Sequence, residues 1–313
     1  MASKGFTAVK GRRVRVTRVD ACGRPVFGED SQAVSKGVIS AAWTANTIES
    51  DEINQTNFSG ERCIYEPSEP ELTGYTLELQ FCEVDPELFA LVTGQSVYYD
   101  GNGDAIGFSI STKVSLNERA FALEIWAGAP AGDACADPNA QGSYGYFLAP
   151  FLKGGILGDY TIENGAVTFT VSGATTRDGN QWGVGPYNVM LNGGIVGPLT
   201  RALTPDEHKL LLWVNVAPPE LFYGTRPLLD PDNSAVVSVA VAEGSMPTEA
   251  DITFTGVTAG TPVWVDFGDG EWDYVEDASV GSTHQYATNG TFTVKASTNG
   301  TWVSATPVVI PFP

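Results

Sequence analysis

Apolar and polar side chains alternate along much of the chain, the pattern of strands with one buried and one solvent-facing side. The clearest stretch is 73–81, where the apolar positions are Tyr75, Leu77, Leu79 and Phe81. Comparable alternation predicts further strands at residues 12–19, 38–48, 118–128, 166–172 and 209–216. The chain is therefore predicted to be mainly β.

One short helix is predicted at residues 85–93, directly after the clearest strand. Asp85 is a favourable N-cap, and Pro86 suits the first helical position. Gly94 favours the left-handed conformation that ends many helices. The pattern thus predicts a strand that leads into one flanking helix.

Two connections in this part of the chain stand out. Residues 96–111 predict a hairpin with a turn rich in Asp, Asn and Gly. Residues 49–72 are polar and acidic, and they are long for a connection inside a compact domain. We interpret them as an arm or loop available to a neighbouring subunit.

From residue 235 the predicted strands become short and closely spaced, with Gly, Asn and Pro turns between them. This rhythm is typical of a small all-β sandwich. A Pro-rich segment precedes it, with the sequence PPELFYGTRPLLDPDNS. We therefore expect two domains: residues 1–231, with a basic N-terminal arm, a β-sandwich and the helix, and residues 232–313, a second β-sandwich.

The net charge of −20 at pH 7 is unevenly distributed. Residues 1–36 contain eight Lys or Arg and three acids, whereas the rest of the chain contains nine basic and 34 acidic residues. The acidic body argues against a protein that binds nucleic acid or an anionic membrane. A basic arm and an acidic body predict self-association, with a solvated basic terminus as the alternative. The inter-subunit candidates are Lys10, Arg12, Arg13, Arg15, Arg18, Glu49, Asp51 and Glu52.

No motif indicates catalysis or metal binding. Neither His208 nor His284 lies in a nucleophile motif, and no close pair of ligands typical of zinc is present. We expect no enzyme, no metal and no cofactor. No apolar stretch is long enough for a transmembrane helix or a secretory leader, so we expect no membrane insertion. We expect reduced, structural thiols at Cys22, Cys63, Cys82 and Cys135.

Residues 263–297 contain the segments WVDFGDG, HQY and TFTVKAS, which resemble a PKD domain. The residues that carry the motif are Trp264, Asp266, Gly268, Asp269, Gly270, His284 and Tyr286. The resemblance implies an Ig-like sandwich, a fold that this family uses for surface-displayed binding or spacer modules. Whether the domain binds host-surface glycans is open.

The first 230 residues resemble the major tail (tail tube) proteins of long-tailed actinobacterial phages. The resemblance rests on GRRVRVTRVDACGRPVFG, YTLELQFCEVDPELFALVTG, WGVGPY and the stretch from LTPDEHK to VAPPE. It implies a β-sandwich with one flanking helix, six copies per ring, rings stacked into a hollow tube, and an outward-projecting Ig-like domain. The implied partners are other copies of the chain, the tape-measure protein, tail-end proteins and, in passage only, viral DNA. The implied location is the virion tail, after assembly in the host cytoplasm.

Polar strand faces supply candidates for the lumen wall of such a tube, and they are Glu78, Gln80, Glu124, Thr168 and Thr170. An acidic wall would let DNA slide without specific binding, because it repels phosphates. The alternative for Glu78 and Glu124 is a solvated outer face. The rival functions are a PKD-bearing cell-surface or carbohydrate-binding protein and, as a third class, a capsid decoration protein.

Overall fold

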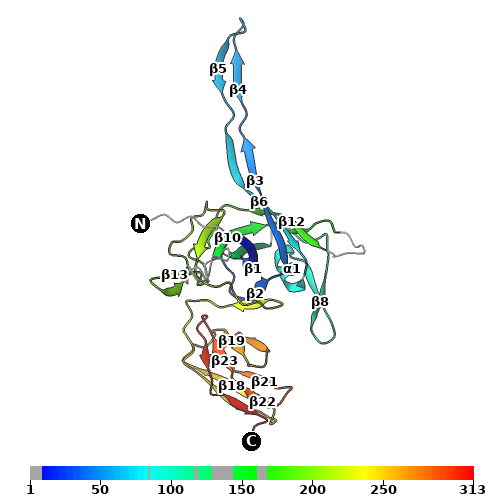
Figure 1. The fold of residues 1–313 in the computed structure, drawn as a ribbon, viewed down its shortest axis with the longest axis vertical. Helices are drawn as coiled ribbons and strands as arrows, with labels where there is room; N and C mark the ends of the chain where they lie inside the picture. Colours follow the sequence, from blue (N-terminus) through cyan, green and yellow to red (C-terminus); the bar gives the residue numbers. More distant parts are fainter. Residues whose placement is uncertain (1–8, 84, 116–118, 129–143, 161–167) are drawn as a thin grey trace, which may run out of the picture. The chain divides into compact units, whose positions relative to one another are not determined.

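A computed structural model describes residues 9–83, 85–115, 119–128, 144–160 and 168–313, which form strands and one helix (Figure 1). The prediction of a mainly β fold is confirmed. The chain divides into two compact units, Met1–Pro25 with Gln32–Gly224 and Val26–Ser31 with Thr225–Pro313. The sequence placed the boundary after residue 231 and contained no sign that residues 26–31 belong with the C-terminal part.

The first unit is built on one antiparallel sheet with the strand order β2-β1-β9-β10-β12-β6-β3. Its strands are β1 (Val9–Val19), β2 (Gly28–Ser35), β3 (Val38–Glu49), β6 (Pro70–Phe81), β9 (Ala120–Gly128), β10 (Tyr144–Lys153) and β12 (Phe169–Thr176). Two more strands pair with it, β11 (Ile156–Leu157) with β12 and β15 (Leu210–Val214) with β10. The predicted strands at 12–19, 38–48 and 73–81 are confirmed as β1, β3 and β6.

One face of this sheet packs against the single helix, α1 (Pro86–Thr93). The predicted ends of the helix are confirmed. Asp85 Oδ1 accepts hydrogen bonds from the N–H groups of Glu87 at 3.0 Å and Leu88 at 3.4 Å, and Gly94 has the left-handed φ of 73°. The core on this face contains Val14, Val16, Leu77, Leu79, Phe81, Leu88, Phe89, Val92, Phe121, Leu123, Leu152 and Val171, with Ala33, Ala149 and Ala174.

A second core lies on the opposite face of the same sheet. It contains Val19, Trp126, Tyr146, Leu148, Phe151, Trp182, Val189, Leu199, Leu203 and Val214, with Ala120 and Ala122. The loops that follow β12 supply Trp182, Leu199 and Leu203, so they cover the sheet over β9 and β10. For this reason β9 is buried on both faces, and the prediction that it is half-buried is wrong.

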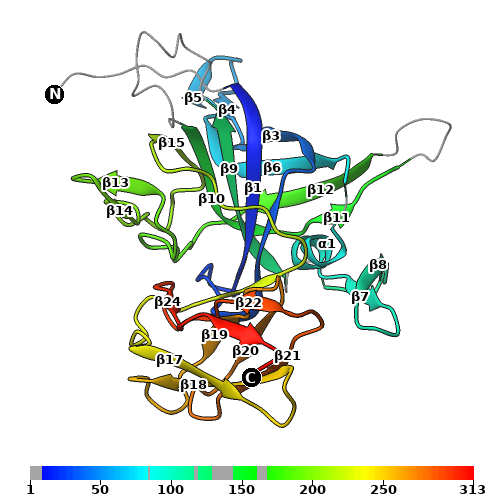
Figure 2. The same ribbon diagram turned by 60° about the horizontal axis from the view of Figure 1, so that its bottom comes forward.

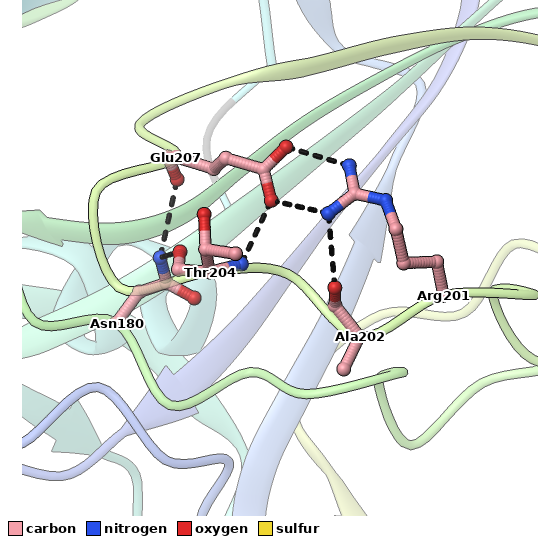
Figure 3. Close-up of polar contacts among 5 residues, drawn as sticks. All are labelled: Asn180, Arg201, Ala202, Thr204 and Glu207. Atoms are coloured by element: carbon pink, nitrogen blue, oxygen red, sulfur yellow. Dashed lines mark hydrogen bonds and ion pairs between the residues drawn. The ribbon is translucent and has the colours of Figure 1, made fainter.

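A polar turn holds part of this covering segment in place (Figure 3). Glu207 accepts two hydrogen bonds from Arg201, at 2.6 and 2.8 Å, and one from the N–H of Thr204 at 2.7 Å. Asn180 donates to the carbonyls of Thr204 at 2.7 Å and Glu207 at 3.2 Å. The turn therefore ties the segment near Asn180 to the segment that leads into β15.

Three hairpins of the described residues extend from the first unit. The longest is β4 (Ile53–Thr56) with β5 (Arg62–Glu66), which continues β3 and β6 beyond the sheet (Figure 1). The hairpins β7 (Ser96–Tyr99) with β8 (Ala105–Ser109) and β13 (Met190–Asn192) with β14 (Ile195–Gly197) leave the unit on opposite sides (Figure 2). The hairpin predicted at 96–111 is confirmed.

The second unit contains two sheets packed around one core, as a β-sandwich does. One sheet has the order β17-β18-β21 and the other β20-β19-β23-β24. Their strands are β17 (Ser238–Glu243), β18 (Glu249–Thr255), β21 (Ser282–Gln285), β20 (Trp272–Val275), β19 (Val263–Asp266), β23 (Lys295–Ser297) and β24 (Val303–Ser304). The strands β22 (Gly290–Phe292) and β25 (Val308–Ile310) form a separate pair, and β16 (Arg226–Leu228) precedes the sandwich.

The turn around Glu207 generates a pH prediction. The hydrogen bonds from Arg201, and then the N–H of Thr204, lower the pKa of Glu207 from 4.5 to about 2. Because the folded pKa lies below the unfolded one, the stabilisation is complete above about pH 4.5 and is lost as the pH falls toward 2. In an NMR titration of the side-chain carboxyl carbons, Glu207 should titrate near pH 2, and Arg201→Gln should raise its midpoint. A wild-type midpoint near 4.5 would contradict the assignment.

Candidate self-association surfaces

The hairpin β4–β5 and the adjoining ends of β3 and β6 form an acidic arm, which we define as residues 49–72. It contains seven acidic residues and one base, Arg62. Every residue of β4 and β5 is exposed. The exposed large apolar side chains on and beside the arm are Ile48, Ile53, Phe58, Ile64, Tyr65 and Leu72. Such a concentration of exposed apolar groups marks a surface for a partner.

The tip of the arm is an ordered turn that presents Phe58. Asn57 Oδ1 accepts hydrogen bonds from the N–H groups of Ser59 and Glu61, both at 2.9 Å, and Gly60 takes the left-handed φ of 80°. Asn and Gly are the residues that favour such a turn. Phe58 is fully exposed, so the turn holds an apolar side chain at the end of an acidic hairpin.

The base of the arm is fixed by a chain of hydrogen bonds. The N–H of Tyr75 donates to Thr176 Oγ1 at 2.9 Å, this hydroxyl lies 2.7 Å from His208 Nδ1, and His208 Nε2 lies 2.7 Å from Asp178 Oδ1. A Cβ at Gly74 would lie 2.9 Å from Thr176 Oγ1, so this close approach requires glycine. The hydroxyl–imidazole–carboxylate order is also that of catalytic triads. Thr176, however, is buried, and its side-chain oxygen accepts a hydrogen bond from a backbone N–H. This series of hydrogen bonds is therefore an anchor for the arm.

A basic groove lies at one end of the first core, between β1 and β3, with a cavity volume of about 280 Å³. Its apolar lining includes Val38, Ile39, Trp43, Ile125 and Phe147, and its cations are Arg12, Arg13 and Lys36. Arg12 and Lys36 are exposed. Arg13 Nε is buried and has no hydrogen-bond partner among the described residues. The groove thus offers apolar contacts and positive charge together.

The predicted inter-subunit residues fall into three groups. Glu49, Asp51 and Glu52 are exposed on the acidic arm, and Arg12 and Arg13 line the basic groove. Lys10 and Arg18 are exposed elsewhere on β1. Residues 9–19 form the strand β1, which pairs with β9 along its length and with β2 at Val14–Thr17, so these residues do not form a free basic arm. Residues 1–8 of the predicted arm lie outside the described residues.

The structure corrects the sequence predictions for Arg15 and Glu124, because these two residues form a buried ion pair. Arg15 is 7% exposed and Glu124 is 0% exposed. The guanidinium Nε and Nη2 donate to the two carboxylate oxygens at 2.5 and 2.7 Å, and Tyr146 OH donates to Oε1 at 2.6 Å. Arg15 also lies 3.2 Å from the centre of the Tyr187 ring. Arg15 therefore cannot contact another subunit, and Glu124 cannot face a lumen.

Burial in this cluster also shifts the titration of its members. Desolvation raises the pKa of Tyr146 and of Tyr187 above the usual range for tyrosine. Desolvation lowers the pKa of Arg15, but the neighbouring carboxylate of Glu124 outweighs it, and the pKa is raised. The guanidinium and both phenols therefore keep their protons at neutral pH.

The remaining lumen candidates share one polar sheet face. Gln80 on β6 is the register partner of Thr170 on β12, and its Nε2 lies 3.4 Å from Thr168 Oγ1. Glu78 is exposed opposite Ala42 of β3. The loops that bury Glu124 cover only the β9 and β10 part of this side of the sheet, so Glu78 stays in contact with solvent. We call Glu78, Gln80, Thr168 and Thr170 the polar face.

Most residues of the WVDFGDG motif meet at one turn of the second unit. His284 Nε2 lies 2.8 Å from Asp269 Oδ2, the His284 ring stacks on Phe267 at 4.0 Å, and Tyr286 OH donates to the Phe267 carbonyl at 3.0 Å. Asp266 Oδ1 accepts from the N–H of Gly268 at 2.9 Å, where a Cβ would lie 2.8 Å from the Thr293 carbonyl. The turn ends at Gly270, with a φ of 103°. Trp264 lies apart from this turn, beside Trp272 and Trp302.

Metal ligands, thiols and membrane spans complete the description of the candidate sites. No group of three or more His, Cys, Asp or Glu side chains there is placed to hold a metal ion. Cys22, Cys63 and Cys82 are free thiols and exposed, and Cys135 lies outside the described residues. No helix in the described ranges has the length and apolar character needed to span a bilayer.

No protein-family model and no curated protein sequence matches this chain. The geometry and chemistry of the chain's own residues are therefore the basis for inferring a function. The sequence did not single out Phe58, Ile39, Lys36 or Phe147 as site residues. The only available signal was at Phe58, a large apolar residue within a long polar run.

The buried pair generates a stability prediction. Glu124→Ala leaves the Arg15 guanidinium buried without its carboxylate and should lower the free energy of unfolding by about 3–5 kcal/mol. The double variant Arg15→Met, Glu124→Leu should lose less, because no unpaired charge remains. Denaturant unfolding measures both. The matched control is Glu78→Ala, an exposed carboxylate that should change stability by about 0.5 kcal/mol or less; equal losses for the two alanine variants would contradict the assignment.

Proposed function

We propose that this chain is a structural virion protein that polymerises as stacked six-membered rings into the tail tube of a long-tailed phage, through which DNA passes on ejection. In this proposal the first unit builds the tube, and the second unit is an appended Ig-like module. The observation that carries the proposal is the coexistence, on one unit, of the acidic arm with its apolar tip and the basic groove with its apolar lining.

Two different complementary surfaces on one chain support open-ended assembly. When a surface binds a different surface on the next copy, the contact is heterologous, and it generates rings or filaments rather than closed dimers. Opposite charges on the two surfaces favour the correct pairing and disfavour arm–arm or groove–groove contacts. The fixed base of the arm limits the conformational entropy lost on docking.

The other two hairpins expose apolar side chains that are available for lateral contacts within a ring. Tyr98 and Ile106 are exposed on β7–β8, and Ile195 and Val196 on β13–β14. These hairpins leave the unit on opposite sides, as lateral neighbours in a ring require (Figure 2). At the end of the sheet, β3 has β6 as its only ladder partner among the described strands, so a second copy could pair with its free edge.

The polar face suits a wall past which DNA slides. It carries one carboxylate, Glu78, among neutral amide and hydroxyl groups, and no cation. Phosphates find no cation to bind on such a wall. At physiological salt, screening within about 8 Å confines the repulsion from Glu78 to DNA close to the wall.

A second candidate function is that of a cell-surface or carbohydrate-binding protein that carries a PKD-like module. The exposed tryptophans of the second unit favour it. It leaves the acidic arm and the basic groove of the first unit without a role, and for this reason we place it second.

The test uses two charge-reversed variants of the full chain. Asp51→Lys with Glu52→Lys changes only the arm, and Arg12→Glu with Lys36→Glu changes only the groove. Wild-type protein at rising concentration should form rings and hollow tubes in negative-stain electron micrographs, whereas each variant alone should need at least a ten-fold higher concentration to associate. An equimolar mixture should associate better than either variant alone, because the arm of each variant is opposite in charge to the groove of the other.

The control for the groove variant is Lys113→Glu with Arg177→Glu, which changes the charge equally at exposed positions outside the groove. It should assemble as wild type does. Sedimentation velocity measures association in each sample. Wild-type protein that remains monomeric at every concentration, or variants that assemble normally, would contradict the proposal.

A further inference from the structure

The second unit carries a cluster of tryptophans on the outer face of its four-stranded sheet. The residues of β19 that alternate with its buried valines are Trp264 and Asp266, so both point away from the core. The register places Trp272 of β20 and Lys295 of β23 on either side of Asp266. Trp302 comes directly before β24 and contacts Trp264. We call these five residues the tryptophan face.

The three indole rings lie edge to face, with Trp264 between the other two. Trp264 is central, with ring centroids 6.0 Å from Trp272 and 5.0 Å from Trp302, and interplanar angles of 78° and 63°. Trp272 is 36% exposed and Trp302 is 40% exposed. Arg226 lies over the Trp264 ring at 5.7 Å. The aromatic surface left to solvent therefore belongs to the two outer rings.

The core of the sandwich does not need this cluster. Val263 and Val265 fill the inner side of β19 and are fully buried, whereas the tryptophans lie on the other side of the sheet. Trp264 Nε1 is buried and has no hydrogen-bond partner among the described residues, and an unpaired buried donor lowers the stability of the fold. Exposed aromatic groups gathered at such a cost indicate a binding surface.

The polar groups on the face indicate which ligand fits. Asp266 and Lys295 are cross-strand partners, so an acceptor and a donor lie side by side and their charges offset each other. The second unit contains 13 acids and two bases, Arg226 and Lys295, and this negative balance disfavours anionic polymers. A sugar ring has a C–H face that packs on an indole and hydroxyls that pair with both a carboxylate and an ammonium group.

We propose that the tryptophan face binds neutral oligosaccharides or polysaccharides, with Trp272 and Trp302 as stacking surfaces and Asp266 and Lys295 as hydrogen-bonding groups. The proposal concerns the second unit alone and does not depend on the assembly proposed for the first. A second copy of the chain, or another protein, is the competing occupant, and the experiment separates it from a glycan.

Affinity electrophoresis of the full chain tests this, with mannan, dextran or xyloglucan as neutral polymers and alginate as an anionic one. At least one neutral polymer should retard the wild-type protein, and alginate should not. Trp272→Ala with Trp302→Ala should weaken the retarding interaction at least ten-fold. The double Phe variant at the same positions should keep most of it, because an aromatic face remains. The control is Val309→Ala, an exposed valine of β25 outside the face, and it should behave as wild type.

The proposal is overturned if no neutral polymer retards the protein, if only alginate does, or if the double Ala variant is retarded as strongly as wild type. It is also overturned if that variant loses self-association in sedimentation velocity without any change in retardation, since the face would then be a protein interface. Unfolding curves for each variant establish that a loss of binding is not a loss of fold.

Discussion

The first unit depends on the burial of one ion pair within a sheet covered on both sides. Arg15 and Glu124 lie on adjacent strands in the middle of the sheet, and an unpaired charge at either position would be costly. Tyr146 and Tyr187 enclose the pair, and Tyr187 comes from the loops after β12. These loops must therefore stay in place for the sheet to be stable, which gives the turn around Glu207 its structural importance.

The same loops divide one side of the sheet into two regions with different roles. Over β9 and β10 this side of the sheet is buried under aromatic side chains. Over β12, β6 and β3 the loops do not cover it, and it is polar. Strand alternation alone cannot distinguish these regions, because Glu78 and Glu124 each follow a buried leucine along the strand, Leu77 and Leu123. The alternation predicted the strands correctly, but the covering segment comes from more than fifty residues further along the chain than Glu124, at Trp182 and beyond.

Local signals predicted what local interactions determine. The N-cap Asp85, the stop at Gly94 and the hairpin at 96–111 are each set by a few neighbouring residues, and the structure confirms them. The basic groove was not predictable in this way, because it joins side chains from five strands whose contact is a property of the whole sheet. Trp302 likewise meets Trp264 only because β24 pairs with β23.

The acidic arm shows why the distinction between a loop and a hairpin matters for function. A mobile loop of the same composition would lose much of its conformational freedom on binding, at roughly 1–2 kcal/mol per residue. Two ladders, one that ends at Glu49–Pro70 and one that runs from Ile53–Glu66 to Thr56–Arg62, have already ordered most of the backbone. The hydrogen bonds among Thr176, His208 and Asp178 hold the base of the arm. Docking of a preformed hairpin therefore retains more of the gain from Phe58 and the acidic side chains. The smaller loss of conformational entropy matters most for a contact that forms again at every step of a growing assembly.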